Sequence, residues 1–320
     1  MKTSMLIHPS ELSKKWIDKL VDAGVNTLGL HPVGGKASAG AIKALVDVAK
    51  TKEYRDLIDY AKARGLEIEY ELHSASYLMP RELFVEHPEY FRVNKNGQRT
   101  PDWNFCVSNQ EALELFANNA ASLANDLYGS SNNYYFWMDD GKDFKCRCEK
   151  CQNLSMSDQQ MIALNAAIAK INENDVGARL AYLAYMDTLE LPENVSPNDG
   201  IFLEYAPFEK YTAKGENAGE RIDNEKRMLT SLIGFFGKEH CKVLEYWYDN
   251  SLFSGWKKPP KRFVLNRENM QKDINEYAKL GFENVSTFAC YLGEDYEELY
   301  GDVDISDFFS IVDGLKRKGV

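Results

Sequence analysis

The fold is decided by the stretch SNQEALELFANNAASLANDLYGSSNNYYFWMDDG, residues 108–141. Apolar residues recur at helical spacing between Leu113 and Leu127, which predicts an amphipathic helix. A short polar turn with one glycine follows, and the aromatic run Tyr134–Met138 is then typical of a buried strand. The stretch therefore predicts one helix–turn–strand unit, with two carboxylates directly after its strand.

The same unit recurs along the chain on both sides of this stretch. Alternating helices and strands indicate a parallel sheet, and a count of eight strands favours a closed barrel over an open, doubly wound sheet. No glycine-rich phosphate loop follows the first strand, which argues against a nucleotide-binding open sheet. The expected strands are residues 5–7, 25–30, 66–72, 134–138, 179–185, 201–205, 243–248 and 285–289.

These patterns predict the α/β class and a single (β/α)8 TIM barrel. A length of 320 residues is normal for one such barrel, so we expect residues 1–320 to form one domain. A last helix, Ile305–Leu315, would close the ring, and the longest insertion is expected at about residues 74–108, after the third strand. Ser157 followed by Gln160 is interpreted as the capping box of the helix before the fifth strand.

The composition limits the partners that this chain can have. The net charge of −11 argues against a nucleic-acid partner and an anionic membrane surface, because both require basic patches. No stretch reaches the ~18 apolar residues that a membrane span needs. The N-terminus lacks the charged and apolar segments of a signal peptide, so we expect a cytoplasmic protein. No organic cofactor is indicated, and the oligomeric state is left open.

Functional residues of a (β/α)8 barrel lie at the C-terminal ends of its strands. Here nearly every strand end carries a carboxylate, a histidine or an aromatic residue. This mixture suits a sugar-processing site, because carboxylates supply the acid and the base or nucleophile, while aromatic rings bind the apolar faces of sugars. His8 and His31, each followed by proline, fit a structural role equally well. The candidates for substrate binding are His31, His73, Trp137, Glu204, Tyr205, Tyr246 and Trp247.

Asp139 and Asp140 form the candidate catalytic pair at the end of the fourth strand. Two adjacent carboxylates repel each other, which would keep a proton on one of them for a leaving group. Trp137 precedes the pair, and Gly141 frees the backbone after it. The alternative is a structural role in which one aspartate caps a helix or pairs with Lys142.

Glu245 is a further catalytic candidate because it lies inside an apolar strand, where an unpaired charge is costly to bury. Strand alternation places Glu245 and Trp247 on one face. If that face points inward, Glu245 lies across the barrel mouth from Asp140. The same argument applies to Glu204 on the sixth strand. A structural salt bridge is the alternative.

Clustered cysteines after the fourth strand indicate a metal site. Cys146, Cys148 and Cys151 form a C-x-C-x-x-C motif, and Cys106 ends the insertion that should lie beside that loop. Four thiolates fit a closed tetrahedral zinc site, which would be structural because a catalytic zinc needs an open position. The alternatives are free thiols, or a disulfide in an oxidising compartment.

Several further motifs occur between Glu71 and Ala289: PEYFRV at 88–93 with NG at 96–97, NFCVSN at 104–109, DG at 140–141 before the cysteines, and EYWY at 245–248 with PP at 259–260. Together they resemble a bacterial domain of unknown function that is related to the family-20 hexosaminidases and found beside α-glucuronidase-like modules. The most specific motif is Asp-Gly followed by the clustered cysteines. The resemblance implies a barrel that acts on glycosides.

In family-20 enzymes the fourth strand ends in Asp-Glu, where the Asp orients the substrate acetamido group as nucleophile and the Glu is the general acid. By position, the resemblance implies that Asp139 polarises such a group and that Asp140 is the acid. Asp140 is one methylene shorter than the family's Glu, so its leaving group would have to come closer.

A second resemblance, to family-42 β-galactosidases, concerns the cysteines. Some of those enzymes hold zinc with a cysteine before the fourth strand and a C-x-C-x-x-C after it, which Cys106, Cys146, Cys148 and Cys151 match. The match supports a structural zinc more than galactosidase activity, because the acid of that family belongs to an Asn-Glu pair.

These patterns predict a retaining glycoside hydrolase that removes a terminal sugar from an oligosaccharide or cleaves a small glycoside. Asp140 would be general acid/base and Glu245 the nucleophile, about 5–5.5 Å away. In a substrate-assisted variant, Asp139 takes the second role and Glu245 binds hydroxyl groups. Two alternatives are a non-catalytic glycan-binding barrel and a zinc-dependent hydrolase such as a deacetylase. The sugar, anomer and linkage are left open.

Overall fold

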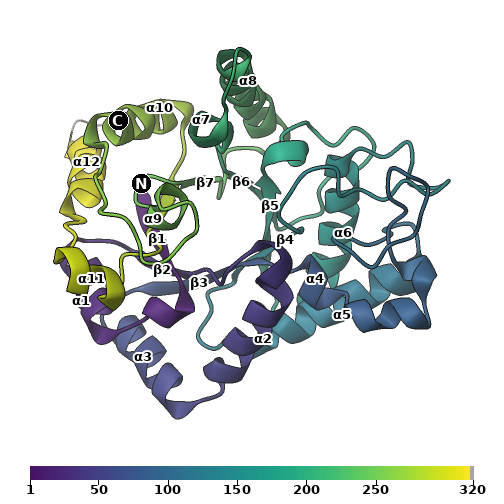
Figure 1. Cartoon of the computed structure of the whole chain (residues 1–320), viewed down its shortest axis with the longest axis horizontal. Coiled ribbons are helices and arrows are strands. Elements are labelled where there is room, and N and C mark those ends of the chain that lie inside the picture. The colour runs from purple at the N-terminus through teal and green to yellow at the C-terminus, as the bar shows by residue number, and fades with distance from the viewer. Residues whose placement is uncertain (318–320) are drawn as a thin grey trace.

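Eight parallel strands close into a barrel in the computed structural model, which describes residues 1–317 (Figure 1). Neighbouring strands follow one another in sequence, and β8 pairs with β1 to close the ring. The predicted (β/α)8 barrel is therefore confirmed. The strands are β1 (Lys2–Ile7), β2 (Thr27–Leu30), β3 (Glu67–His73), β4 (Asn133–Trp137), β5 (Arg179–Ala184), β6 (Ile201–Tyr205), β7 (Lys242–Glu245) and β8 (Asn284–Phe288).

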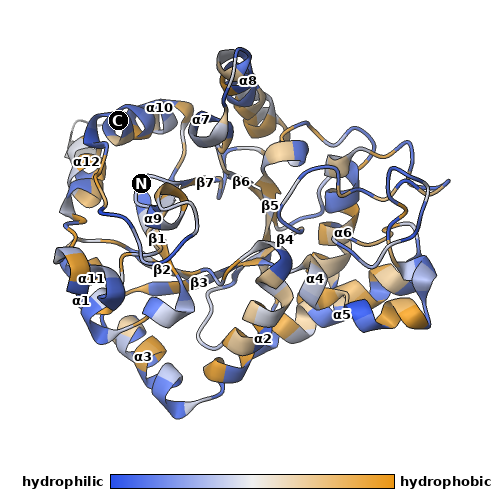
Figure 2. Cartoon of the chain, in the orientation of Figure 1, coloured by the Kyte–Doolittle hydropathy of each residue, from blue (hydrophilic) through white to orange (hydrophobic). Residues whose placement is uncertain are grey.

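The helices surround the barrel (Figure 1) and carry both hydrophobic and hydrophilic residues (Figure 2), as expected where one face covers a sheet and the other meets water. Among the helices of residues 1–317, none combines the length and the apolar character that crossing a membrane requires. The helices are α1 (Lys14–Asp22), α2 (Ser38–Ala49), α3 (Lys52–Ala63), α4 (Ala75–Leu78), α5 (Gln110–Asp126), α6 (Met156–Ile171), α7 (Glu209–Thr212), α8 (Ala218–Phe236), α9 (Asn250–Phe253), α10 (Arg267–Leu280), α11 (Glu294–Tyr300) and α12 (Ser306–Arg317).

Two hydrophobic cores follow from the alternation of side chains along each strand. On β4, Tyr135 and Trp137 belong to the cluster inside the barrel, and Phe136 belongs to the larger cluster between the strands and the helices. On β7, Leu244 points into the barrel and Val243 points towards the helices. The direction of a strand residue therefore decides whether it can reach the barrel mouth.

Below the mouth, the barrel interior contains a buried group of charges. The Lys242 ammonium lies 2.9 Å from Glu69 Oε2, 2.5 Å from Glu71 Oε1 and 3.7 Å from Glu204 Oε1. The same ammonium lies 4.1 Å from the ring centre of Tyr135. Burial and the Glu71 charge raise the pKa of Glu204 well above its usual value. Lys242 is thus the cation shared by three buried glutamates.

One helix start differs from its prediction. The capping box of α6 consists of Ser155 and Asp158, so the prediction of Ser157 and Gln160 was wrong. Ser155 has the extended backbone (φ −65°, ψ 170°) that a capping residue adopts. Ser157 and Gln160 lie within the helix and are buried, and Gln160 donates a hydrogen bond of 3.0 Å to a carbonyl of β5.

The seventh strand is shorter than predicted. β7 ends at Glu245, and the chain then turns into the short helix α9. Asp249 caps this helix by accepting hydrogen bonds from the backbone N–H groups of Ser251 and Leu252. The turn ends the strict in–out alternation before Asp249, so the strand pattern alone does not give the direction of that side chain.

The segment between α4 and α5 forms a lobe beside α5 and α6 (Figure 1). Two short antiparallel contacts, Phe91 with Phe105 and Val93 with Arg99, bring its two halves together. The amide of Asn119 on α5 donates a 2.8 Å hydrogen bond to a carbonyl of α4. The lobe also meets the loop that follows β4, where the Arg92 guanidinium donates a 3.0 Å hydrogen bond to the carbonyl of Asp143.

Replacing Lys242 by Met keeps most of its volume but leaves three buried carboxylates without their shared cation. We expect the free energy of unfolding to fall by about 3 kcal/mol, because the buried charges lose their compensation. Urea denaturation followed by tryptophan fluorescence measures this change. The control is Lys2→Met, whose partner Glu67 is half exposed and whose loss should cost less than about 1 kcal/mol. Equal costs for the two variants would contradict this account of the interior.

Candidate active site

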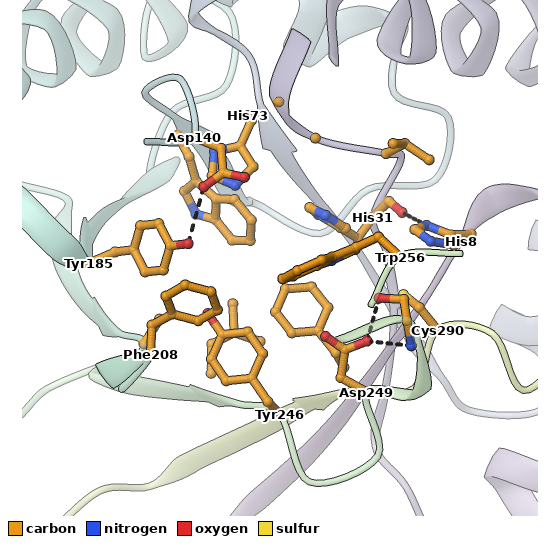
Figure 3. Close-up of a pocket in the computed structure, with 18 of the residues that line it drawn as sticks. His8, His31, His73, Asp140, Tyr185, Phe208, Tyr246, Asp249, Trp256 and Cys290 are labelled. Carbon is orange, nitrogen blue, oxygen red and sulfur yellow. Dashed lines mark hydrogen bonds between the residues drawn. The ribbon is translucent and has the colours of Figure 1, made fainter. Parts of the chain in front are cut away.

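The C-terminal ends of the strands enclose a cavity of about 430 Å³ (Figure 3). Each of the eight strands contributes to the wall, either with its last residues or with the loop that follows. The wall is mostly aromatic, with a few polar groups. It is lined by His8, His31, Val33, Gly34, Gly35, His73, Trp137, Asp140, Leu183, Tyr185, Ala206, Phe208, Leu244, Tyr246, Asp249, Ser251, Trp256, Phe288, Cys290 and Tyr291.

Asp140, which follows β4, is the half-buried carboxylate of this wall. Its Oδ1 accepts a hydrogen bond of 3.1 Å from the Tyr185 hydroxyl (Figure 3). Its Oδ2 lies beside the loop after β2, 3.7 Å from where a Cβ on Gly34 would stand, which is an ordinary van der Waals distance. The nearer neighbour of that position is His73, whose Cδ2 would lie 3.1 Å away. Asp140 is therefore held by one hydroxyl and still borders the cavity.

Asp249, which follows β7, is the second carboxylate of the wall and lies on the opposite side of the cavity from Asp140 (Figure 3). Its Oδ1 accepts hydrogen bonds from the Ser251 N–H (3.0 Å), the Ser251 hydroxyl (2.6 Å) and the Leu252 N–H (3.2 Å). Burial raises the pKa of Asp249, and these donors together with the nearby His8 oppose that rise. Because all three hydrogen bonds end on Oδ1, Oδ2 remains for a ligand.

Aromatic rings supply most of the remaining surface. The Trp137 indole forms part of the floor and donates a 2.8 Å hydrogen bond to Glu204 in the barrel interior. Tyr246 lies 5.2 Å from Phe288 between ring centres. Trp256 has 62% of its surface exposed and lies at the mouth (Figure 3). Rings of this kind can cover the C–H faces of a sugar.

Three histidines line the side of the cavity formed by β1, β2 and β3. Each uses Nδ1 to bond a backbone carbonyl of the next strand or its loop: His8 to His31 (2.7 Å), His31 to Glu71 (2.8 Å) and His73 to Met138 (2.8 Å). Burial lowers the pKa of His8, and burial together with the two neighbouring histidines lowers that of His31 well below its usual value.

Asp139 is placed outside the cavity, despite its expected role beside Asp140. Its side chain is 1% exposed and forms a 2.9 Å ion pair with Arg81. It also accepts hydrogen bonds from the Ser76 N–H (3.1 Å) and hydroxyl (2.5 Å). The two adjacent carboxylates therefore have separate partners, and the expected repulsion within the pair is offset by the Arg81 charge. Asp139 fastens the lobe after β3 to the end of β4.

Glu245 also lies outside the cavity, because the face that it shares with Trp247 points towards the helices. Its oxygens accept hydrogen bonds from the Lys210 ammonium (2.5 Å), the Tyr211 hydroxyl (2.7 Å) and the Tyr277 hydroxyl (2.5 Å). Trp247 packs against α12. The side chain of Glu245 points outward, so it does not face Asp140. The structure instead contains the alternative, a structural salt bridge with Lys210.

Glu204 and Tyr205 do not border the cavity either. Glu204 is fully buried in the interior charge group, where it meets Lys242 and the Trp137 indole. Tyr205 points outward, and its hydroxyl donates a 3.3 Å hydrogen bond to the carbonyl of Glu225 on α8. Glu204 is therefore used inside the barrel, and Tyr205, the last residue of β6, misses the cavity because its side chain points towards α8.

The four clustered cysteines come together as the spacing indicates. The Sγ atoms of Cys106, Cys146, Cys148 and Cys151 all lie within 4.8 Å of one another. Cys106 Sγ lies 3.6 Å from Cys148 Sγ and 4.0 Å from Cys151 Sγ. These distances bracket the sulfur–sulfur separation of about 3.8 Å in a tetrahedral Zn–S₄ centre. Gln159 of α6 braces this loop through the backbone N–H and carbonyl of Cys146. The arrangement is compatible with a closed metal site.

The predicted residues thus fall into two groups. His31, His73, Trp137, Asp140 and Tyr246 meet around the cavity, and Asp139, Glu204, Tyr205, Glu245 and Trp247 are elsewhere. Sequence reasoning missed Asp249, Tyr185 and Trp256 as members of the wall. A signal for Asp249 existed, since it follows directly the run 243–248 that was predicted as a strand and precedes the Asn-Ser pair that opens α9.

Comparisons with known proteins agree with this architecture. A family model described as "Domain of unknown function (DUF4838)" matches residues 46–295. A search of curated protein sequences finds no match. All the motifs quoted for the family-20 and family-42 resemblances lie within the matched residues. The relations to those two families stay predictions.

Solved structures with a similar fold include three glycoside-cleaving enzymes. The β-galactosidase from Rahnella sp. R3 is 11% identical with a TM-score of 0.60, and the match covers 99% of this chain and 56% of that chain. The β-galactosidase from Marinomonas ef1 is 11% identical with a TM-score of 0.58, covering 99% and 60%. Endo-glycoceramidase II from Rhodococcus sp. is 11% identical with a TM-score of 0.54, covering 90% and 73%. The chain thus spans little more than half of the two galactosidases, and at this identity the likeness concerns the fold.

If Asp139 holds the lobe to the end of β4, its contribution to stability comes from its ion pair with Arg81. We expect Asp139→Asn to lower the free energy of unfolding by about 3 kcal/mol, because the partly buried guanidinium loses its counter-charge. Urea denaturation of Asp139→Asn, Arg81→Met and the double variant gives the coupling energy of the pair. A double variant that costs as much as the sum of the two single variants would mean that the pair is not coupled.

Proposed function

The chain belongs to the family described as "Domain of unknown function (DUF4838)", and we propose that it is a glycoside hydrolase that uses Asp140 and Asp249 as its two carboxylates. The observation that carries the proposal is the position of these groups. They follow β4 and β7 and border one aromatic-lined cavity from opposite sides (Figure 3). Two carboxylates flanking a sugar-sized site are what glycoside hydrolysis requires.

Asp140 is the general acid/base in this proposal. It is half-buried and lies near the surface, where a leaving group can depart and water can enter. In the first step Asp140 donates its proton to the glycosidic oxygen as the bond from that oxygen to the anomeric carbon breaks. In the second step the Asp140 carboxylate takes a proton from the water that attacks the anomeric carbon. The Tyr185 hydroxyl positions the carboxylate through Oδ1 and leaves Oδ2 for these transfers.

Asp249 takes the role that was expected of Glu245, that of nucleophile in a retaining mechanism. Its Oδ2 would bond to the anomeric carbon as the leaving group departs, and water would later release the sugar. The three donors on Oδ1 orient the carboxylate and stabilise its charge against burial. Glu245 cannot act in this way, because three side chains of the outer layer bind its oxygens.

The other mechanisms and functions considered from the sequence are less well supported. Substrate assistance through Asp139 requires that residue to meet the substrate, whereas Arg81 and Ser76 bind it outside the cavity. A glycan-binding barrel would not need two carboxylates facing the ligand. A zinc hydrolase would need its metal in the cavity, and none of the clustered cysteines lines it.

We further propose that Cys106, Cys146, Cys148 and Cys151 hold one structural zinc ion. Four thiolates complete a tetrahedral shell, so no position is left for a substrate or for water. The ion would tie the lobe after β3 to the loop after β4 and thereby steady the backbone that carries Asp140. All chemistry in the proposed reaction is then assigned to residues of the cavity and none to the metal.

The hydrolase proposal is tested with aryl glycosides, including N-acetylhexosaminides, galactosides and glucuronides in both anomers. We expect turnover of at least one of them, and a loss of about 10²–10⁴-fold in kcat for Asp140→Asn and for Asp249→Asn. The control is Asp56→Asn, an exposed residue of α3 whose change should leave kcat as it is. Near-ultraviolet circular dichroism shows whether each variant keeps its fold.

The two aspartate variants also separate their roles. With a dinitrophenyl leaving group, which needs no protonation, Asp140→Asn should recover its first step and Asp249→Asn should not. Azide should restore turnover in both variants. In Asp140→Asn it replaces the attacking water and gives a glycosyl azide of retained anomeric configuration, and in Asp249→Asn it replaces the nucleophile and gives the inverted product. Turnover that survives both substitutions would refute the assignment of these residues.

The zinc proposal predicts about one zinc ion per chain by elemental analysis of protein purified without added metal. Cys148→Ser, the change at the only half-buried thiol among the four, should lower the zinc content and the melting temperature. The matched control, Cys241→Ser, lies elsewhere and should keep both values, because a serine can keep the hydrogen bond to the Gly237 carbonyl. Chelation that stops turnover while the fold is unchanged would instead indicate a catalytic metal.

A further inference from the structure

The three histidines of the cavity form a regular row on consecutive strands. His8, His31 and His73 follow β1, β2 and β3, and each ring bonds the backbone of the next strand or its loop. The ring centres lie 6.2 Å apart for His8 and His31, and 6.0 Å apart for His31 and His73. The row is thus built into the barrel backbone and presents one wall of the cavity to any ligand.

These bonds decide which hydrogen-bonding group each ring offers. A carbonyl oxygen can only accept, so the Nδ1 atoms of all three rings carry the hydrogen. In the neutral ring Nε2 then has a lone pair and accepts a hydrogen bond. Since the bonds of the rings to the protein are made through Nδ1, the Nε2 atoms remain for the ligand. The wall therefore offers a series of acceptors, which matches a ligand rich in hydroxyl donors.

The charges around the cavity also favour an uncharged ligand. Among the described residues that line it, the acidic groups are Asp140 and Asp249, and neither lysine nor arginine is present. Two cations lie near the wall and each is paired with an acid, Lys258 with Asp295 (2.6 Å) and Arg81 with Asp139 (2.9 Å). A carboxylate, sulfate or phosphate on a ligand would meet the two aspartates here, and no residue of the lining is a cation that compensates it.

We propose that the cavity selects an uncharged sugar ring, with hydroxyl groups donating to the histidine row, and excludes acidic sugars such as uronic acids. This inference rests on the proposed hydrolase function, whose substrate class it specifies. The aromatic faces of Trp137 and Tyr246 bind the C–H surface of such a ring without regard to charge, so the selection falls to the histidines and the two aspartates.

The test compares pairs of ligands that differ only at C6. Titration calorimetry of the wild-type protein uses 4-nitrophenyl 1-thioglucoside and 1-thiogalactoside, in both anomers, against the corresponding thiouronides. Thioglycosides resist hydrolysis, so binding is measured apart from turnover and with both aspartates intact. We expect the better neutral ligand to bind roughly tenfold or more tightly than its uronide, because the uronide carboxylate loses its hydration beside like charges.

Histidine variants test the source of the selectivity. His73→Phe, at a half-buried ring, and His31→Phe, at a buried one, should each weaken binding of the neutral ligand by about tenfold, since a sugar hydroxyl loses its acceptor. The matched control is His87→Phe on the lobe after β3, an exposed ring that should leave the affinity unchanged. If His31→Phe does not fold, His73→Phe still answers the question.

The outcomes separate this inference from the hydrolase proposal. A neutral preference that the histidine variants weaken supports the inference, even if no glycoside is hydrolysed and the hydrolase proposal fails. Equal or tighter binding of the uronides overturns the inference and leaves the hydrolase proposal standing if they are turned over. Loss of affinity in His87→Phe equal to that in His73→Phe overturns the role of the row. Binding of neither series overturns the inference, and the hydrolase proposal is then decided by the aryl glycoside panel alone.

Discussion

A side chain on a barrel strand can point only into the barrel or towards the helices, and this constraint governs the whole structure. On β7 it directs Leu244 inward and Glu245 outward, into the contacts with Lys210 and Tyr277. On β4 it brings Trp137 beneath the cavity. A residue escapes the constraint only where its strand has ended, and both carboxylates of the cavity, Asp140 and Asp249, stand just beyond strand ends.

The interior of the barrel separates two electrostatic environments. At the base, the Lys242 ammonium lies among Glu69, Glu71 and Glu204, all of them buried. At the mouth, the carboxylates are held by uncharged donors, so they remain able to take part in chemistry. The Trp137 indole connects the two levels, since it donates to Glu204 below and forms part of the cavity floor above. Lys242 thus contributes to the stability of the barrel, and it does not line the cavity at the mouth.

The lobe after β3 and the loop after β4 are held together by several kinds of bond. The Arg81–Asp139 ion pair joins them, and the cysteine group joins them a second time through Cys106 and the C-x-C-x-x-C loop. The stacked rings of Trp103 and Phe144, 4.1 Å apart between centres, join them again. These contacts hold the loop between β4 and α6, which carries Asp140.

The sequence by itself determined the eight strands, the intervening helices and the C-x-C-x-x-C part of the cysteine group, because each depends on periodicity or spacing over a few residues; Cys106 was added because its segment was expected beside that loop. The sequence also marked the strand ends as the place of the site. Only the tertiary structure decided between neighbours such as Asp139 and Asp140, whose local patterns are equivalent but whose partners come from distant segments. It likewise shows that Asp249 borders the cavity and Glu245 does not, because β7 directs Glu245 towards the helices and ends there, so that Asp249 lies beyond the strand.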